Sequence, residues 1–225
     1  MATTPESTRI TLIRHGESNV TVQRVIGGHR SCTGLSDLGR RQSERLARRL
    51  DASGELAADV FLSSTFARAV ETAQIIRTAI GADAIEQWPE FGEHDPGAEI
   101  DGMTFDDYVA HFGTPDWSGD PGAEIFPGGE TTASFHTRVR GALRRVLETH
   151  AGADVVVSCH GGVVDAAFRY ALDLPVTGGF ALHTLNTSLT EFVAPGRPGE
   201  AWRLVRYNDA AHLAGLPSAT ERTST

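Results

Sequence analysis

The chain has 225 residues, of which 40% are hydrophobic and 22% charged, which is ordinary for a soluble globular protein with one sizeable core. Its formal net charge of −9 argues against broad binding to nucleic acid or to an anionic membrane, because both need a basic surface. No apolar run approaches the roughly 18 to 20 residues of a membrane span, and residues 1–8 lack the features of a signal peptide, so we expect a cytoplasmic protein.

The first predicted strand, residues 9–14, ends directly in Arg14-His15-Gly16. Apolar and β-branched residues fill this stretch, and Gly16 lets the backbone turn at once. The carboxyl ends of strands are where open α/β sheets bind ligands, so an arginine beside a histidine at such an end marks a candidate site. A polar loop over residues 17–36 is predicted to follow.

The next elements are a helix, a strand and a second helix. Ser36 is a plausible N-cap for a helix that continues to about Leu50. Residues 59–64 predict a strand that ends in hydroxyl side chains. Residues 65–80 predict a helix, and Gly81 suits the position just after its end.

Residues 81–129 are the least regular part of the chain, rich in Gly, Pro, Asp and aromatic residues. Loop-rich inserts of this length inside a compact domain are usually functional, so we predict a lid at about residues 91–129. A short helix is expected near residues 105–111. The aromatic residues of this segment could form the small core of the lid or contact an apolar or ring-shaped part of the substrate. We favour the first interpretation.

The second half of the chain alternates helices and strands. Helices are predicted over residues 129–149 and 163–171, and strands over 154–158, 185–193 and 202–207. The valine run of the first of these strands is typical of a parallel sheet covered on both faces. The whole pattern predicts an α/β fold with three layers, α/β/α, and a mostly parallel central sheet.

We expect one domain over residues 1–216, followed by a flexible tail over residues 217–225. The sequence shows no internal repeat. A strand near residues 202–207 could pair with another chain at the edge of the sheet, and the oligomeric state stays open.

Three predicted strand ends carry polar groups. They are Arg14-His15, Ser63-Ser64 with Arg68 just after, and Cys159-His160. Parallel strands bring their carboxyl ends to one edge of the sheet, so two arginines and two histidines should converge there. Guanidinium groups suit phosphate oxygens, and a neutral histidine can attack phosphorus. A second histidine can donate to the phosphoryl oxygens as charge shifts, so the pattern predicts phosphoryl transfer. The partner we expect is therefore a small phosphorylated substrate.

The sequence resembles the histidine phosphatase superfamily, which has the phosphoglycerate mutase-like fold, over about residues 9–193. Five motifs carry the resemblance in order: LIRHGES, LSDLGRRQ, SSTFARAVETA, PGGE and VVSCHGG. The resemblance implies a phosphohistidine mechanism that needs no metal and no other cofactor. It implies a role for each matching residue: His15 as the nucleophile, Arg14 and Arg68 as phosphate ligands, His160 as the second catalytic histidine, and Glu93 as the proton donor.

The proton donor has competing candidates, because Glu90 and Glu99 lie in the same irregular segment as Glu93. Glu93 is favoured because it lies where the family has its acid, after an apolar residue. Ser18 and Thr21 are candidates to touch the substrate. The family commonly has Asn at the position of Thr21, so contact is less expected there.

Other polar residues are assigned structural roles. Glu130 suits the amino end of a helix, and Cys159 is interpreted as a small core residue rather than a thiol nucleophile. Two cysteines do not make a disulfide framework. The remaining singled-out histidines are assigned to the surface or to capping positions: His29, His94, His111, His136, His183 and His212.

The same residues serve a phosphatase, which passes the phosphoryl group to water, and a mutase, which returns it to the substrate. Mutases of the family follow the acid with an arginine and a glycine-rich stretch, whereas residues 94–103 here are acidic. The chain also has no lysine or arginine between Phe91 and Arg138. These differences favour phosphomonoester hydrolysis over mutase-type isomerisation. A non-catalytic phosphoryl-binding module is the least expected, because every site residue is present.

Overall fold

The structure, a computed structural model, describes residues 7–178, 180–196 and 200–216; the predicted tail lies outside this range. Its strands are β1 (Arg9–Arg14), β2 (Val60–Ser63), β3 (Glu86–Gln87), β4 (Asp154–Cys159), β5 (Leu189–Val193) and β6 (Arg203–Asp209). They form one sheet in the order β3-β2-β4-β1-β5-β6. β1 to β4 are parallel, and β5 runs antiparallel to both of its neighbours. The predicted α/β fold with a mostly parallel sheet is therefore confirmed.

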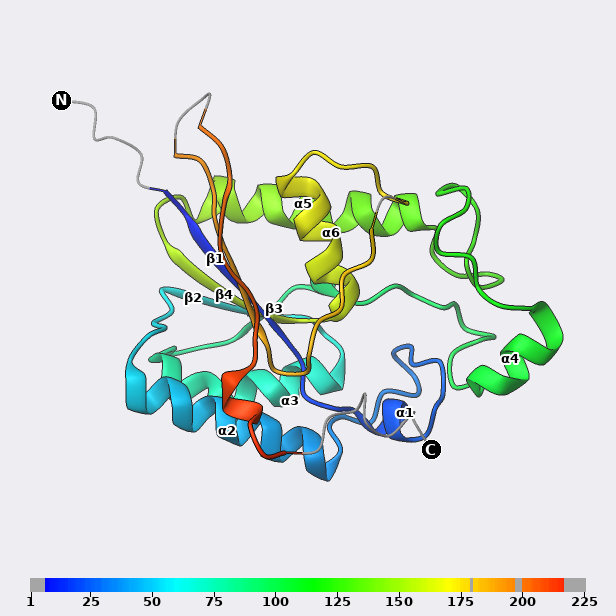
Figure 1. The fold of residues 1–225 in the computed structure, drawn as a ribbon, viewed down its shortest axis with the longest axis horizontal. Coiled ribbons are helices and arrows are strands. Elements are labelled where there is room, and N and C mark those ends of the chain that lie inside the picture. Colours follow the sequence, from blue (N-terminus) through cyan, green and yellow to red (C-terminus); the bar gives the residue numbers. More distant parts are fainter. Residues whose placement is uncertain (1–6, 179, 197–199, 217–225) are drawn as a thin grey trace.

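Helices cover both faces of this sheet (Figure 1). The helices in the described ranges are α1 (Asn19–Val22), α2 (Asp37–Ser53), α3 (Ala67–Ile76), α4 (Phe105–Phe112), α5 (Thr132–Thr149) and α6 (Gly161–Ala171). Three short 3₁₀ helices are η1 (Arg77–Ile80), η2 (Pro89–Phe91) and η3 (Ala211–Leu213). α2 and α3 lie on one face, and α5 and α6 on the other. No helix in the described ranges is long and apolar enough to cross a membrane.

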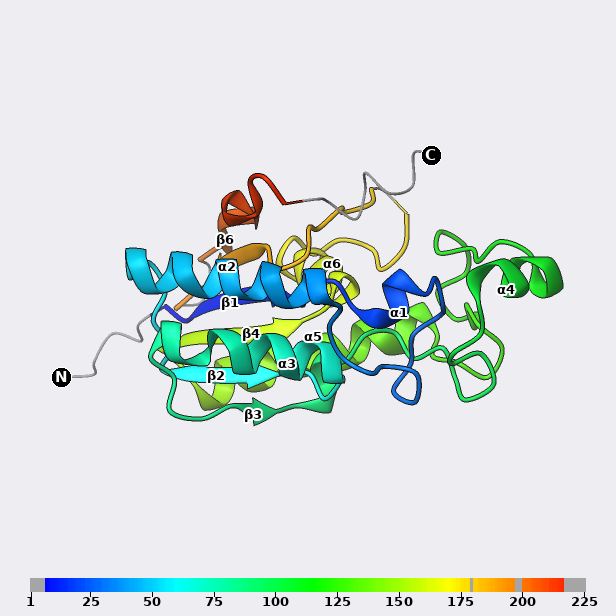
Figure 2. The ribbon, with the colours of Figure 1, turned by 90° about the horizontal axis from the view of Figure 1, so that it is seen from below.

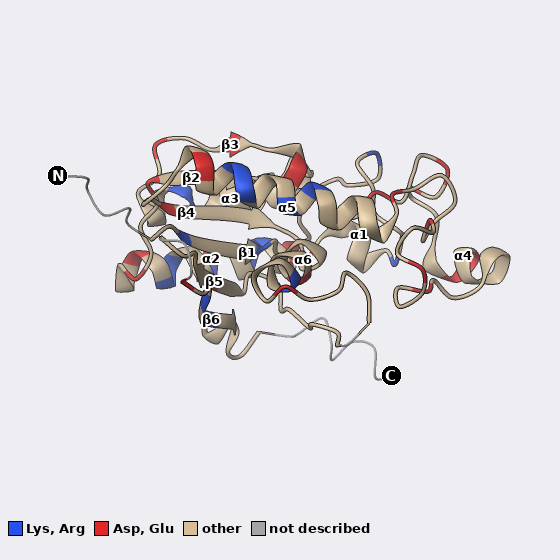
Figure 3. Ribbon diagram, turned by 90° about the horizontal axis from the view of Figure 1, so that it is seen from above, with Lys and Arg blue, Asp and Glu red and all other residues tan. Residues whose placement is uncertain are grey.

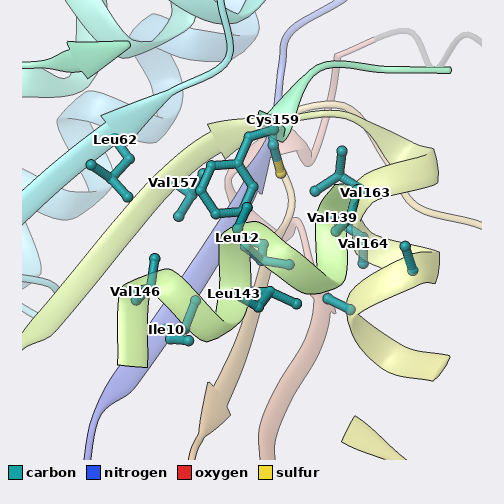
Figure 4. Close-up of a cluster of buried hydrophobic side chains, with 14 of the residues drawn as sticks. Ile10, Leu12, Leu62, Val139, Leu143, Val146, Val157, Cys159, Val163 and Val164 are labelled. Carbon is teal, nitrogen blue, oxygen red and sulfur yellow. The ribbon is translucent and has the colours of Figure 1, made fainter. Parts of the chain in front are cut away.

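The core consists of two apolar clusters, one on each side of the sheet. Val155 and Val157 of β4 pack towards α5 and α6, in the cluster shown in Figure 4. Val156, between them, packs with Leu46 of α2 and Ile76 of α3. Successive side chains of a strand point to opposite faces, so a continuous valine run fills both clusters. This double burial holds the central strands firmly, and with them the residues that follow their ends.

Several predicted boundaries differ from the structure. The predicted helix over residues 65–80 begins at Ala67 and finishes as the tighter helix η1, and the predicted loop over 17–36 contains α1. β5 begins at Leu189 rather than at residue 185. The residues before it turn back on the end of β1, where Thr187, with a φ of 55°, donates its N–H to the carbonyl of Arg14 at 2.8 Å. Side-chain pattern alone does not reveal that turn.

The segment between η2 and α5 lies beyond the carboxyl ends of β1, β2 and β4 (Figures 1 and 2). It has a small core of its own, in which Tyr108 and Phe126 pack with Ile100 and Ile125. The carboxylate of Asp101 accepts hydrogen bonds from the N–H groups of the loop at residues 28–31. Its helix α4 carries Asp106 and Asp107 in its first turn and contains no lysine or arginine (Figure 3). That this segment closes as a lid, and that the chain is a single domain over residues 1–216, stay predictions.

Two helical glycines should respond oppositely to replacement by alanine. A Cβ at Gly39, near the start of α2, would lie 1.9 Å from the backbone oxygen of Glu17, so Gly39→Ala should destabilise the fold by about 2 kcal/mol. A Cβ at Gly141 in α5 would meet no atom within 4 Å. Gly141→Ala should therefore raise the free energy of unfolding by roughly 0.5–1 kcal/mol, because alanine favours the helix. Urea denaturation of both variants measures the difference, and a stable Gly39→Ala protein would contradict the close approach.

Candidate active site

The polar strand ends do meet at one edge of the sheet. β2, β4 and β1 are adjacent and parallel, and they place Ser64, His160 and His15 at their carboxyl ends. Arg68 comes from the first turn of α3, which follows β2. His160 is also the N-cap of α6, so the positive end of that helix dipole points to the same place.

The two histidine rings lie 5.0 Å apart between centroids, and Arg68 stands between them. His15 Nδ1 lies 2.6 Å from the carbonyl oxygen of Gly16, which assigns the proton to Nδ1 and leaves the lone pair on Nε2. Arg68 Nε–H donates to this Nε2 at 3.1 Å and to His160 Nδ1 at 3.3 Å. His160 Nε2 lies 2.8 Å from the hydroxyl of Ser64. Both rings therefore direct a lone pair towards the arginine.

Burial and positive charge keep both rings neutral. His15 is 6% exposed and His160 fully buried. Burial lowers the pKa of each ring well below its ordinary value, and the Arg68 and Arg14 guanidiniums lower both pKa values further. A histidine must be neutral to act as a nucleophile, so the surroundings hold His15 in the reactive state.

The protonation of these rings can be measured directly. A lowered pKa means that the neutral form persists as the pH falls, so the His15 and His160 rings should stay neutral below the pH at which an ordinary imidazole, with a pKa of about 6.5, takes up its proton. Long-range ¹H–¹⁵N NMR spectra of the imidazoles report this state. The unfolded chain takes up these protons near pH 6.5, so stability should fall as the pH drops below that value. A His15 titration centred near pH 6.5 would contradict the assignment.

Arg14 holds a buried hydrogen-bond donor without a partner. Its Nη1 donates to the carbonyl of Thr184, but its Nε has no hydrogen-bond partner among the described residues. Burial lowers the pKa of the guanidinium. A buried donor left unpaired is costly, and an anion in the neighbouring pocket would satisfy it. Arg14, Arg68 and His15 all line that pocket.

Of the three candidate acids, only Glu93 lines the pocket. Its Oε2 accepts from the N–H of Gly162 at 3.2 Å, in the first turn of α6. A Cβ at position 162 would lie 2.3 Å from Glu93 Oε1, so the glycine makes room for the carboxylate. Glu90 instead lies 3.5 Å from Arg145, and Glu99 is exposed.

Arg138 of α5 holds the turn that carries Glu93. It donates to the backbone oxygens of Glu90, Gly92 and Glu93 at 2.9 to 3.2 Å. Its guanidinium also pairs with the carboxylate of Glu130 at 2.7 Å. Glu130 precedes the N-cap of α5, and its ion pair with Arg138 gives it a structural role, because it orients the guanidinium.

Ser18 and Thr21 both line the pocket, with their hydroxyl oxygens 2.9 Å apart. Ser18 is buried and Thr21 exposed. Cys159 is fully buried among apolar side chains (Figure 4), and burial raises the pKa of its thiol far above the usual range. It is a core residue, as the sequence indicated, and no thiolate forms there at neutral pH.

The surface assignment of two histidines was wrong. His94 and His136 are only 7% and 9% exposed, and both line the pocket. Two supporting residues were also missed: Ser64, which contacts His160, and Asn186, whose Nδ2 donates to the carbonyl of His15 at 2.9 Å. The hydroxyl residues at the end of β2 were a usable signal for Ser64. The sequence around Asn186 contains no comparable signal for its role.

The pocket has a volume of about 970 Å³, much more than a phosphate group needs. No group of three or more His, Cys, Asp or Glu side chains suited to a metal occurs in the described part of the chain, and metal independence stays a prediction.

Residues 10–210 match the histidine phosphatase superfamily (branch 1). The chain belongs to the histidine phosphatase superfamily. The predicted family is thereby confirmed.

Similar proteins in this superfamily include phosphatases and a mutase-like protein. The chain is 31% identical over 212 residues to phosphoglycerate mutase-like protein 4 of Arabidopsis thaliana, covering 91% of this chain and 86% of that protein. A mycobacterial glucosyl-3-phosphoglycerate phosphatase, solved as a complex with VO3, aligns at a TM-score of 0.71 and 25% identity over 89% of this chain and 98% of that one. The α-ribazole phosphatase of Shigella flexneri shares the fold, with a TM-score of 0.76 and 22% identity over 90% and 96% of the two chains.

Proposed function

We propose that this histidine phosphatase family member hydrolyses phosphomonoesters through a phosphohistidine at His15. The observation that carries the proposal is His15 Nε2 accepting from Arg68 Nε at 3.1 Å, in the same pocket that Arg14, with its unpaired Nε, also lines. One nucleophilic nitrogen and two guanidinium donors thus share a buried corner of the pocket. This set can bind a phosphate group and attack its phosphorus.

In the first step Arg14 and Arg68 bind the phosphoryl oxygens, and His15 Nε2 attacks phosphorus. The N–P bond forms while the bond from phosphorus to the ester oxygen breaks, and Glu93 gives its proton to the departing alcohol. Phosphate displaces the Arg68 N–H from His160 Nδ1. Because the Ser64 hydroxyl can either donate or accept, His160 can then carry its proton on Nδ1 and donate to a phosphoryl oxygen.

In the second step a water molecule attacks the phosphohistidine from the side that the alcohol has left. The carboxylate of Glu93 takes a proton from this water as the new P–O bond forms and the N–P bond breaks. Inorganic phosphate leaves, His15 is again neutral, and Glu93 is again protonated. One carboxyl group thus serves as acid and then as base.

Hydrolysis is preferred over isomerisation because of the segment that borders the pocket. Residues 92–137 contain no lysine or arginine, so this segment cannot hold the carboxylate of a phosphoglycerate by an ion pair. Incubation with p-nitrophenyl phosphate and with 3-phosphoglycerate tests the proposal, with phosphate and 2-phosphoglycerate both assayed. We expect phosphate release from p-nitrophenyl phosphate. Predominant formation of 2-phosphoglycerate would establish a mutase instead.

Glu93→Gln should reveal the proton donor through its dependence on the leaving group. For an alkyl phosphate, whose alkoxide cannot leave unprotonated, kcat should fall by about 10² to 10⁴-fold. For p-nitrophenyl phosphate, whose phenolate leaves without a proton, the phosphorylation step should slow by less than about tenfold. Single-turnover kinetics separate that step from hydrolysis of the intermediate. Glu99→Gln, at an exposed acid of the same segment, is the matched control, and an equal loss with both esters would remove Glu93 from the donor role.

A further inference from the structure

The pocket outside the phosphate-binding corner has largely apolar walls. Val25 and Ile26 line one part, and Trp117, Phe126, Phe135 and Phe180 line others. These residues come from the loop after α1, from the segment between η2 and α5, from α5, and from the chain after α6. A bound substrate would bury its alcohol portion against these rings.

The described part of the pocket has no free cation for a second anionic group. Besides Arg14 and Arg68, the one arginine or lysine in its described lining is Arg169. Its Nε donates to Asp165 at 2.7 Å, and its terminal nitrogens donate to three backbone carbonyls, those of Pro175, Gly178 and Phe180. His136 also lines the pocket, and burial lowers its pKa, so its ring is neutral near pH 7. The other charged residues outside the corner, Asp116 and Asp165, are acidic. An anionic leaving alcohol would meet repulsion without compensation.

His94 supplies an unpaired polar group within the apolar walls. It is 7% exposed; its ring lies close to the backbone of Glu130, but neither ring nitrogen makes a hydrogen bond of normal geometry with a described residue. Its ring packs edge-on against Trp117 at 5.1 Å and against Phe126 at 5.9 Å between centroids. Burial lowers its pKa, so the ring is neutral near pH 7 and cannot replace the missing cation. An unpaired buried imidazole is costly unless a ligand supplies its partner.

We propose that the substrate is a phosphomonoester of an uncharged alcohol with a flat apolar group, whose polar substituent hydrogen-bonds to His94. The proposal rests on the phosphatase function and selects among its substrates. Arg14 and Arg68 bind the phosphate, the aromatic walls cover the flat group, and His94 recognises its polar edge. Phosphorylated carboxylic acids are excluded because they bring a second negative charge.

Two esters of equal shape test the charge preference in the wild-type protein. 4-Carbamoylbenzyl phosphate and 4-carboxybenzyl phosphate differ at one terminal atom and in charge. We expect kcat/KM to be at least tenfold higher for the amide, and an equal or higher value for the carboxylate would overturn the proposal. The corresponding benzylphosphonates, compared by calorimetry, test the same preference without turnover. If the phosphonates show the preference but no ester releases phosphate, the proposed hydrolysis fails while the selectivity stands.

His94→Leu tests the hydrogen bond. It should lower kcat/KM for the carbamoyl ester threefold to tenfold more than for unsubstituted benzyl phosphate, and His94→Gln should recover part of the difference. His111→Leu, on the exposed side of α4, should leave both values unchanged. If His94→Leu lowers both values equally, His94 has no part in recognition. Circular dichroism melting checks that each variant is folded.

Discussion

Replacing His15 by asparagine should lower kcat/KM for p-nitrophenyl phosphate by at least about 10⁴-fold, because it removes the nitrogen that we propose bonds to phosphorus. Asparagine is polar and smaller than histidine, and the hydrogen bond from Asn186 to the backbone carbonyl of residue 15 does not depend on the side chain. The loss should therefore come from the chemistry and not from unfolding. Steady-state rates and urea denaturation, measured on the same sample, separate the two causes.

The same variant should also abolish the covalent intermediate. Acid-sensitive, base-stable ³²P label should be trapped on the wild-type protein during turnover and should be missing from His15→Asn. His111→Asn, an exposed histidine outside the pocket, is the matched control and should behave like wild type. Label retained by His15→Asn would place the nucleophile on another residue.

Arg68→Met should lower kcat/KM by about 10³-fold, a loss expected when an arginine that stabilises a transferring phosphoryl group is removed. Methionine fills similar space beside the ring of Phe66, over which the guanidinium lies at 4.5 Å from the centroid. Arg68 also lowers the pKa of both His15 and His160. Its removal should therefore raise both pKa values, so that the rings take up protons at a higher pH in the NMR titration.

Two further variants separate the causes of this loss. Arg68→Lys keeps the charge but not the planar fork of donors, so it should keep the low histidine pKa values and recover only part of the activity. Arg77→Met changes an exposed arginine at the end of the same helical stretch and should leave activity and pKa values as they are. Wild-type activity in Arg68→Met would show that Arg68 does not bind the phosphoryl group.

The convergence of the proposed catalytic groups could be predicted because it follows from sheet geometry. His15 and His160 each end a strongly apolar strand, and parallel strands bring such ends together without any knowledge of side-chain packing. Arg68 follows a third strand by only a few residues, so little freedom remains for its position. Local sequence also predicted Ser36 as the N-cap of α2, because a serine stands just before the predicted helix. In the structure its hydroxyl accepts from the N–H of Gly39.

The substrate portion of the pocket could not be predicted, because its residues meet through packing between distant segments. His94 is buried by Trp117, Phe126 and Phe135, which lie in a region without helical or strand periodicity or at its border. Nothing in the neighbouring sequence distinguishes His94 from exposed His111. Asn186 reaches His15 from a turn before β5 whose path depends on the left-handed backbone at Thr187.

The fit of the Glu93 carboxylate into the space left by Gly162 ties together two positions that are 69 residues apart. A methyl group at position 162 would occupy the place of the acid, so the residue at each position restricts which side chains the other can carry. A side chain at 162 becomes tolerable only together with a shorter or displaced acid at 93. These two positions should therefore vary as a pair among related chains, with the double substitution less harmful than the sum of the single ones.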